Sequence, residues 1–434
     1  MKLALSLLVI APAALCAQQA ADAGFKPVSL QEAVSLAQQN APSAVQARGA
    51  IENAENAVST TRLQLFPTLS ASASTSRGSG QTNDPTTGAI VTRVNRPVYS
   101  DGLSLNYTLF DGGKRIYDLR ARRADLTAAE VSESATKFNL SLQVKQQYFA
   151  ILAAREAEAA AKLALDLAQQ QLAASSARVR AGAAIISDSL RSFVAVGNAQ
   201  LTVLTAQNNV RNASLALTRL AGSLTPITAQ TDTTGFAIVP VDSADVVTAA
   251  LNGPTVKAAE AGLGASRAAV SSARTAYFPT VSTSYGYNGS GGDWGYGIGG
   301  GNLLYSKSLR LSASYNLWDG RNRAAAVDRA EVAVASSEAS VRDAKLLAQQ
   351  NIQQQLATLR AAEQRIRIQQ LSVQAAQEDL RVQQQRYELG SSTQLEVTTS
   401  INALNTARQA LVQARLDYRT ARAQIEAIIG RDLM

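Results

Sequence analysis

Two hydrophobic patterns alternate along the 434-residue chain, and each occurs twice. In the first, apolar and polar residues alternate with a period of two, which predicts strands with one apolar and one polar face. In the second, a long segment without Gly or Pro carries apolar residues at helical spacing. The chain is therefore expected to be a mixed α and β protein in which short strands lead into very long helices.

The expected elements follow the same order in both halves of the chain. The strands cover about 67–77, 102–111, 279–288 and 308–318. The long helices cover about 113–181 and 321–389, and each is followed by a shorter helix, at about 186–221 and 394–429. At about 1.5 Å per residue, each long helix would extend roughly 100 Å. An ordinary globular domain does not require helices of that length.

Heptad spacing in the long helices predicts coiled-coil packing. In the second long helix, apolar or aromatic residues recur every seven positions at Ile352, Leu359, Ile366, Val373, Leu380 and Tyr387. The corresponding residues of the first long helix are Val144, Ile151, Glu158, Leu165, Leu172 and Val179. Only Glu158 interrupts the series. An earlier series at Val327, Val334, Val341 and Ala348 is displaced from the later one by four residues, so the packing partners are expected to change along the helix.

An internal repeat organises the chain. Asp111 and Asp319 are 208 residues apart, and the same offset relates Gly182 to Gly390 and Gly222 to Gly430. We therefore expect a signal peptide at 1–23, a first repeat at 24–222, a linker at 223–241 and a second repeat at 242–434.

The expected strands have the length and alternation of strands in a membrane-spanning barrel, which is apolar towards lipid and polar towards the lumen. Four strands cannot close such a barrel around water, and open strand edges are not tolerated in lipid. Closure therefore requires several chains. A soluble pair of hairpins with one buried face is the alternative. Segments 78–101 and 288–307 are rich in Gly, Ser, Thr, Asn and Asp, as expected for exposed hairpin loops.

The first 23 residues have the layout of a secretory signal peptide, with Lys2 before an apolar stretch and small residues after it. Cleavage after Ala17 and cleavage after Ala23 both fit this layout. Cys16 is either removed with the signal or is the site of a lipid anchor, and Leu15 before it favours removal. The mature protein is expected to leave the cytoplasm.

The composition excludes most enzyme and metal-site interpretations, because the chain has no histidine and one cysteine. No catalytic residue, metal-ligand set or cofactor site is predicted. Segment 295–300 matches GxGxxG, but it lies between two expected strands with no helix after it. The net charge is +8. The basic residues are spread among acidic ones, so nucleic-acid binding is not expected.

Several motifs together resemble the TolC-like outer-membrane efflux protein family. They are LFDGG at 109–113, LWDGR at 317–321, RYELGSSTQLEV at 386–397 and SLQEAVSLAQQNAP at 29–42, with FPT before the first strand of each half. Each motif is weak alone, but their order and repetition cover essentially the whole mature chain.

The resemblance implies a homotrimer in the cell outer membrane, with a long periplasmic portion. Each chain would supply four strands to a 12-stranded β-barrel, and its helices to a periplasmic α-helical tunnel. The implied partners are a periplasmic adaptor protein and an inner-membrane transporter, besides outer-membrane lipid.

The two strand-to-helix corners are the first group of candidate residues. They comprise Asp111, Gly112, Asp319 and Gly320. Glycine allows backbone angles that other residues resist, and each aspartate can accept hydrogen bonds from N–H groups at the helix start. A helix cap is favoured over a direct contact with cargo.

The turns at Gly182 and Gly390 are the second group, and the family resemblance implies a channel gate there. It implies that Tyr387 is a hydrogen-bonding ring, that Glu396 faces the pore, and that Ser187 and Asp188 are their partners. Ser392 and Thr399 stand where well-known members have an arginine and a second acidic residue, which argues against an arginine-centred link at that position. Solvated helix-start residues are the alternative for Glu396 and Asp188.

The favoured function is a passive outer-membrane exit duct of a tripartite efflux or type I secretion system. A periplasmic coiled-coil adaptor or scaffold is the alternative, although such a protein requires no strands of membrane-spanning length. An enzyme is disfavoured, because the sequence has no nucleophile with an adjacent base and no metal-ligand cluster.

Overall fold

The computed structural model describes residues 24–83, 85, 86, 88–94, 96–230, 238, 243–292 and 303–433. The expected signal peptide with Cys16, most of the linker and the 295–300 segment lie outside these residues.

The chain forms two compact units. Unit 1 combines the described parts of Met1–Arg48, Ser132–Lys257 and Ala344–Met434, and unit 2 combines Gly49–Val131 and Ala258–Asp343. Each unit thus contains segments from both halves of the sequence.

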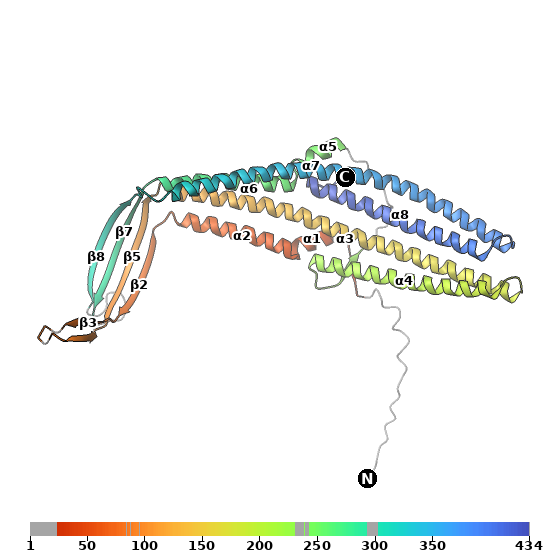
Figure 1. The fold of residues 1–434 in the computed structure, drawn as a ribbon, viewed down its shortest axis with the longest axis horizontal. Coiled ribbons are helices and arrows are strands. Elements are labelled where there is room, and N and C mark those ends of the chain that lie inside the picture. Colours follow the sequence, from red (N-terminus) through yellow and green to blue (C-terminus); the bar gives the residue numbers. More distant parts are fainter. Residues whose placement is uncertain are drawn as a thin grey trace, which may run out of the picture. The chain divides into compact units, whose positions relative to one another are not determined.

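Unit 2 contains an antiparallel four-stranded sheet with the order β2-β5-β7-β8 (Figure 1). Its strands are β2 (Thr68–Ser76), β5 (Val98–Phe110), β7 (Thr280–Gly291) and β8 (Leu304–Ser314). β8 ends four residues before the expected 318, because Ser314 already pairs with Thr280, the first residue of β7. Among the described residues, no strand lies beside β8 beyond Ser314 to accept its hydrogen bonds.

The expected loop at 78–101 contains regular structure that its composition did not predict. β3 (Ser79–Asn83) and β4 (Ile90–Val94) form an antiparallel hairpin, and β5 begins at Val98 instead of 102. The β-branched residues Ile90, Val91 and Val94 favour a strand even between polar neighbours.

The strand register places apolar side chains in a row across the sheet. Leu69 pairs with Leu105, Leu105 with Tyr285, and Tyr285 with Leu309. One residue further along, on the opposite face, the aligned residues are Ser70, Ser104, Gly286 and Ser308. The four apolar side chains are exposed, at 39% or more of their area. The sheet therefore presents an uncovered apolar face and a polar face.

Helices also contribute to unit 2. α6 (Pro254–Arg274) runs beside the first part of α7 (Asn322–Glu388), and Arg267 and Arg274 form ion pairs of 2.9 and 2.8 Å with Glu338 and Glu331. Ser272 of α6 donates a hydrogen bond to Asp118 of α3 (Lys114–Arg180). α2 (Pro42–Leu63) and the short η1 helix (Thr275–Tyr277) precede β2 and β7.

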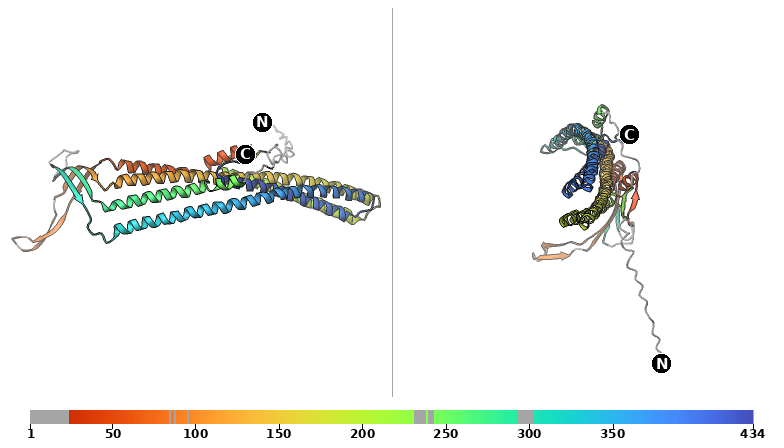
Figure 2. Two further views of the ribbon diagram at one scale, coloured as in Figure 1. Left: turned by 90° about the horizontal axis from the view of Figure 1, so that it is seen from above. Right: turned by 90° about the vertical axis from the view of Figure 1, so that its right-hand side faces the viewer.

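Unit 1 is built from two helical hairpins that lie side by side (Figures 1 and 2). The part of α3 from Ser132 onwards pairs with α4 (Ile186–Ala221). The part of α7 from Ala344 onwards pairs with α8 (Gln394–Ile429). α1 (Leu30–Asn40), α5 (Ser243–Ala250) and a parallel pair of short strands, β1 (Lys26–Val28) and β6 (Ile227–Ala229), pack beside the hairpins. No helix among the described residues is long and apolar enough to cross a membrane.

The heptad residues form much of the core of unit 1. Val144 and Ile151 of α3 are fully buried in one cluster, and Ile352, Leu359 and Ile366 of α7 lie in a second. In α7 the series continues to Leu380 and Tyr387, which are also buried.

The heptad prediction is wrong for α3 beyond Glu158. The buried residues there are Ala161, Ala168, Gln171 and Ser175, whereas Leu165, Leu172 and Val179 are only half-buried. Glu158 forms an ion pair with Lys162 on the helix surface instead of entering the core. The buried face therefore shifts by three residues, which is the kind of interruption that resets coiled-coil packing.

Candidate functional site

The two hairpin turns of unit 1 share one backbone design. Gly182 and Gly390 have φ angles of +72° and +75°, in the left-handed region that favours glycine. At each turn the glycine N–H donates to the carbonyl three residues earlier, and the next N–H donates to a carbonyl five residues earlier. This is the Schellman pattern that ends helices. The two predicted turns therefore end α3 and α7 by the same means.

The helices that follow the turns begin differently. α8 begins with a capping box in which Thr393 Oγ1 accepts from the Glu396 N–H at 3.3 Å, and Glu396 accepts from the Thr393 N–H at 3.2 Å. The N-cap of α4, Ile185, makes no side-chain cap hydrogen bond. Asp188 lies in the first turn of α4, where a negative charge is favourable.

Glu396 is therefore part of the start of α8. Its carboxylate accepts hydrogen bonds from the Ser392 hydroxyl and the Thr393 N–H, and these bonds lower the pKa of the Glu396 carboxyl. Glu396 and Thr399 are exposed, and the Thr399 hydroxyl bonds to the Leu395 carbonyl of its own helix. Ser187 is half-buried at the start of α4. The pore-facing role of these residues stays a prediction.

Tyr387 is buried, but not as a hydrogen-bonding ring. Burial raises the pKa of its hydroxyl, and that hydroxyl has no hydrogen-bond partner among the residues that the structure describes. Instead, the guanidinium of Arg178 lies 4.4 Å from the centre of the Tyr387 ring and donates a hydrogen bond to the Tyr387 carbonyl. Arg178 thus links the end of α3 to the end of α7 through a cation–π contact and a charged hydrogen bond.

Arg178 is not among the site residues predicted from the sequence, because an arginine link was expected only at the position that Ser392 occupies. Ser392 itself lies beside Glu396 and the side-chain amide of Gln383. The only signal in the sequence was the internal repeat, in which Arg178 of the first half corresponds to Arg386 of the second half.

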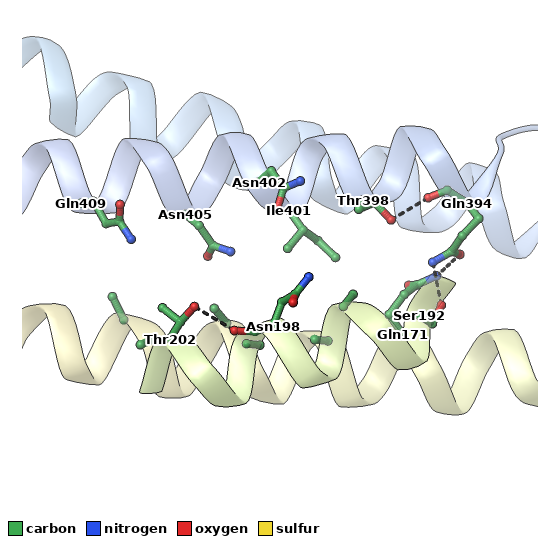
Figure 3. A pocket seen from close by; sticks show the side chains of 16 residues that line it. Gln171, Ser192, Asn198, Thr202, Gln394, Thr398, Ile401, Asn402, Asn405 and Gln409 are labelled. Carbon is green, nitrogen blue, oxygen red and sulfur yellow. Dashed lines mark hydrogen bonds between the residues drawn. The ribbon is translucent and has the colours of Figure 1, made fainter. Parts of the chain in front are cut away.

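A buried polar network beside this contact joins the two hairpins (Figure 3). Gln394 of α8 accepts from the Gln171 amide and donates to Ser192 Oγ at 3.0 Å. Ser192 of α4 lies 3.0 Å from Ser175 Oγ of α3. All four side chains are buried, and all four are neutral. Because buried polar groups are costly without partners, this network fixes how the two hairpins meet.

A cavity of about 300 Å³ continues from this network between α3, α4 and α8 (Figure 3). Its polar lining is mostly neutral amide and hydroxyl groups, including Asn198, Thr202, Asn402, Asn405 and Gln409. Among the described residues there is no group of three or more acidic or thiol side chains able to hold a metal ion.

The strand-to-helix corners lie in unit 2. Asp111 accepts from the N–H groups of Gly113 and Arg115 and pairs with the Arg115 guanidinium at 2.8 Å. Asp319 makes the equivalent bonds to Arg323, at 2.9 Å to its N–H and 2.8 Å to its guanidinium. The two aspartates therefore have the same capping geometry at equivalent positions of the repeat.

The corner glycines differ in their surroundings. Gly112 and Gly320 have φ angles of +67° and +63°. A Cβ atom at Gly112 would lie 2.3 Å from Cβ of Phe278, whereas a Cβ at Gly320 would meet nothing within 4 Å. Only the first corner thus excludes a side chain by close packing.

Comparison with known proteins gives consistent matches. Residues 33–223 and 246–431 match the family described as outer membrane efflux protein. Protein CyaE of Bordetella pertussis is 28% identical over 412 residues, covering 93% of this chain and 84% of that protein.

Two solved structures have the same fold at low identity. CusC superposes with a TM-score of 0.78 at 20% identity, covering 94% of this chain and 93% of CusC. The Campylobacter jejuni CmeC outer membrane channel superposes with a TM-score of 0.76 at 20% identity, covering 92% of this chain and 85% of CmeC.

Proposed function

The chain belongs to the outer membrane efflux protein family, and from that premise we propose that it is the exit duct of a tripartite efflux or type I secretion system. It conducts substrates passively from a periplasmic pump assembly to the exterior, and the energy comes from the inner-membrane transporter. A periplasmic adaptor protein joins the two. The protein is located in the outer membrane, and its helices form a long periplasmic portion.

The observation that carries this proposal is the strand register. The aligned row Leu69, Leu105, Tyr285 and Leu309 gives the sheet one exposed apolar face, and the serines beside them give it a polar face. A sheet of this kind suits a barrel wall between lipid and water. A periplasmic scaffold would leave the same apolar face in water, so this register favours the duct.

The open edges of the sheet support assembly of several copies. Along the described residues, β2 pairs only with β5, and β8 only with β7. Unpaired strand edges are costly in lipid, so β8 of one copy is expected to pair with β2 of the next. Three copies with four strands each would close a 12-stranded barrel, which makes a homotrimer the proposed assembly.

We assign the gate of this duct to the two hairpin turns. Arg178 and Tyr387 join the ends of α3 and α7 within one chain. Because this link is intramolecular, it holds the two hairpins of each copy together. Asp188 and Glu396, at the starts of α4 and α8, supply negative charge at the same end of unit 1.

The assembly is tested by the mass of protein extracted in detergent from isolated outer membranes. We expect a mass corresponding to three mature chains plus bound detergent. A monomer in the soluble periplasmic fraction would overturn the duct and favour the scaffold.

The acidic ring is tested by the variant Glu396→Gln with Asp188→Asn. If these side chains face the pore, the variant loses a ring of negative charge, and its preference for cations should fall. In the wild-type protein the contribution of Glu396 to this preference should persist to more acidic pH than that of an ordinary carboxyl, because hydrogen bonds from Ser392 and Thr393 lower the pKa of Glu396. Unchanged selectivity in planar bilayers would remove both residues from the pore.

A further inference from the structure

Arg321, at the second strand-to-helix corner, has a backbone conformation that its side chain disfavours. Its φ angle is +68°, and no other non-glycine residue in the described part of the chain has a positive φ. The internal repeat has glycine at the equivalent position of the first corner, where Gly113 has a φ angle of +83°. The left-handed conformation strains a residue that carries a Cβ atom, whereas glycine adopts it freely. The turn itself therefore does not explain an arginine at position 321.

The side chain of Arg321 has no partner within the chain. Arg321 is exposed, and its guanidinium makes no hydrogen bond or ion pair with any residue that the structure describes. Arg323, two residues later, is held by Asp319 at 2.8 Å. It also lies 5.4 and 5.6 Å from the ring centres of Tyr277 and Tyr315. Of these two arginines, Arg323 is neutralised and fixed, and Arg321 is not.

From β8 to the corner, exposed side chains follow the order of the layers of a membrane. Leu309 and Leu311 are exposed on the apolar face of the sheet. Tyr315 and Trp318 come next and are also exposed, and Arg321 follows them. Tyrosine and tryptophan are enriched where hydrocarbon meets the headgroups, and arginine keeps its charge among the headgroups. In the proposed barrel, Arg321 is therefore expected at the level of the lipid phosphates.

The protein groups near Arg321 do not supply a counter-ion. In the proposed ring, β8 pairs with β2 of the next copy, so the corner faces segment 60–67, which precedes β2. That segment, TTRLQLFP, contains Arg62 and no acidic residue. Within the same chain, Asp319 is already bound to Arg323, and Asp328 lies seven residues along α7, about 10 Å away. The local charge is thus positive, which favours an anion from outside the protein.

We propose that this second corner binds the phosphate of a glycerophospholipid in the periplasmic leaflet of the outer membrane. The guanidinium of Arg321 donates two parallel hydrogen bonds to phosphate oxygens, a geometry that suits this planar group. The ring of Trp318 packs against the glycerol region of the same lipid. The first corner, with Gly113, has no equivalent site. This inference rests on the proposed outer-membrane duct and names the lipid group that one of its corners recognises.

Native mass spectrometry of the delipidated, detergent-purified protein tests the site, with phosphatidylglycerol as the probe. Arg321→Gly introduces the residue that the first corner has. The variant should retain one phosphatidylglycerol fewer per copy, and its affinity should fall about tenfold or more, because a charged hydrogen-bond donor is lost. Its midpoint of thermal unfolding in lipid-free detergent should not fall, because glycine suits a φ angle of +68°. A merely structural arginine would lower that midpoint.

Two further variants control for charge and geometry. Arg329→Gln removes another exposed arginine about two turns further along α7, whose Nε bonds to the Ala325 carbonyl at 3.1 Å. Lipid retention should stay unchanged in this variant. Arg321→Lys keeps the charge without the planar guanidinium, so an intermediate loss is expected. A diacylglycerol without phosphate should bind equally to the wild type and to Arg321→Gly.

The outcomes separate this inference from the proposed function. Loss of phosphatidylglycerol in Arg321→Gly, with the midpoint of unfolding maintained, supports the site. A trimeric mass with unchanged retention, or an equal loss in Arg329→Gln, overturns the site and leaves the duct standing. Displacement of the lipid by millimolar inorganic phosphate would assign the site to free phosphate and overturn the lipid. Dissociation of the Arg321→Gly trimer would show that Arg321 binds the next copy instead. A monomeric mass of the wild type defeats the duct itself.

Discussion

Replacing Arg178 with alanine is expected to raise the open fraction of the reconstituted channel by about 30-fold. The change removes the guanidinium that lies 4.4 Å from the Tyr387 ring and bonds to the Tyr387 carbonyl. For this half-buried pair, the cation–π contact and the charged hydrogen bond together contribute about 2 kcal/mol, and 1.4 kcal/mol corresponds to about a factor of ten in an equilibrium. Single-channel recording in planar bilayers measures the effect directly.

Three further variants identify which part of the contact acts. Tyr387→Phe keeps the ring and removes only a hydroxyl without a partner in the described structure, so the open fraction should stay near that of the wild type. Arg178→Lys keeps the charge but not the planar guanidinium, and an intermediate effect is expected. Arg180→Ala removes an exposed cation from the same helix end and should change little. If Tyr387→Phe opens the channel as much as Arg178→Ala, the hydroxyl carries the link and the cation–π account is wrong.

Gly112→Ala is expected to destabilise the strand-to-helix corner by about 3 kcal/mol or more. A side chain in the left-handed region costs about 1 to 2 kcal/mol. The new Cβ would also lie 2.3 Å from Cβ of Phe278, an atom fixed close to its own backbone. The clash therefore requires the backbone to move, and strain of this kind typically adds 1 to 3 kcal/mol. A lower midpoint of thermal unfolding in detergent would report the loss.

Gly320→Ala provides the matched control at the equivalent corner of the repeat. Gly320 has nearly the same φ angle, but nothing lies within 4 Å of its Cβ position. The control should therefore lose only the backbone contribution of about 1 to 2 kcal/mol. Equal losses in the two variants would show that packing against Phe278 does not matter.

The sequence predicted the elements whose signals are local. Alternation with a period of two identified the four strands of the sheet, and the absence of Gly and Pro identified α3 and α7. Glycines 182 and 390 mark the turns because only a left-handed residue ends a helix in this way. The motif order identified the family, which the match to residues 33–223 and 246–431 confirms. The gate residues carried over from the resemblance stay predictions.

Local patterns did not predict burial or strand ends correctly where these depend on neighbouring helices or strands. The heptad series in α3 continues past Glu158 in the sequence, but the buried face shifts to Ala161, Ala168 and Ser175. Which face is buried depends on the neighbouring helices, and a pattern within one helix does not contain that information. In the same way, β8 ends at Ser314 because its partner strand starts at Thr280.

By itself, the sequence determined the order of strands, long helices and turns, because each of these depends on residues close together along the chain. Only the tertiary structure placed Arg178 on Tyr387, aligned the apolar row across four strands, and brought Gln171 to Gln394. These contacts join residues that are far apart in the sequence. They are set by how helices and strands pack and by the register between them, and neither can be read from periodicity within a single segment.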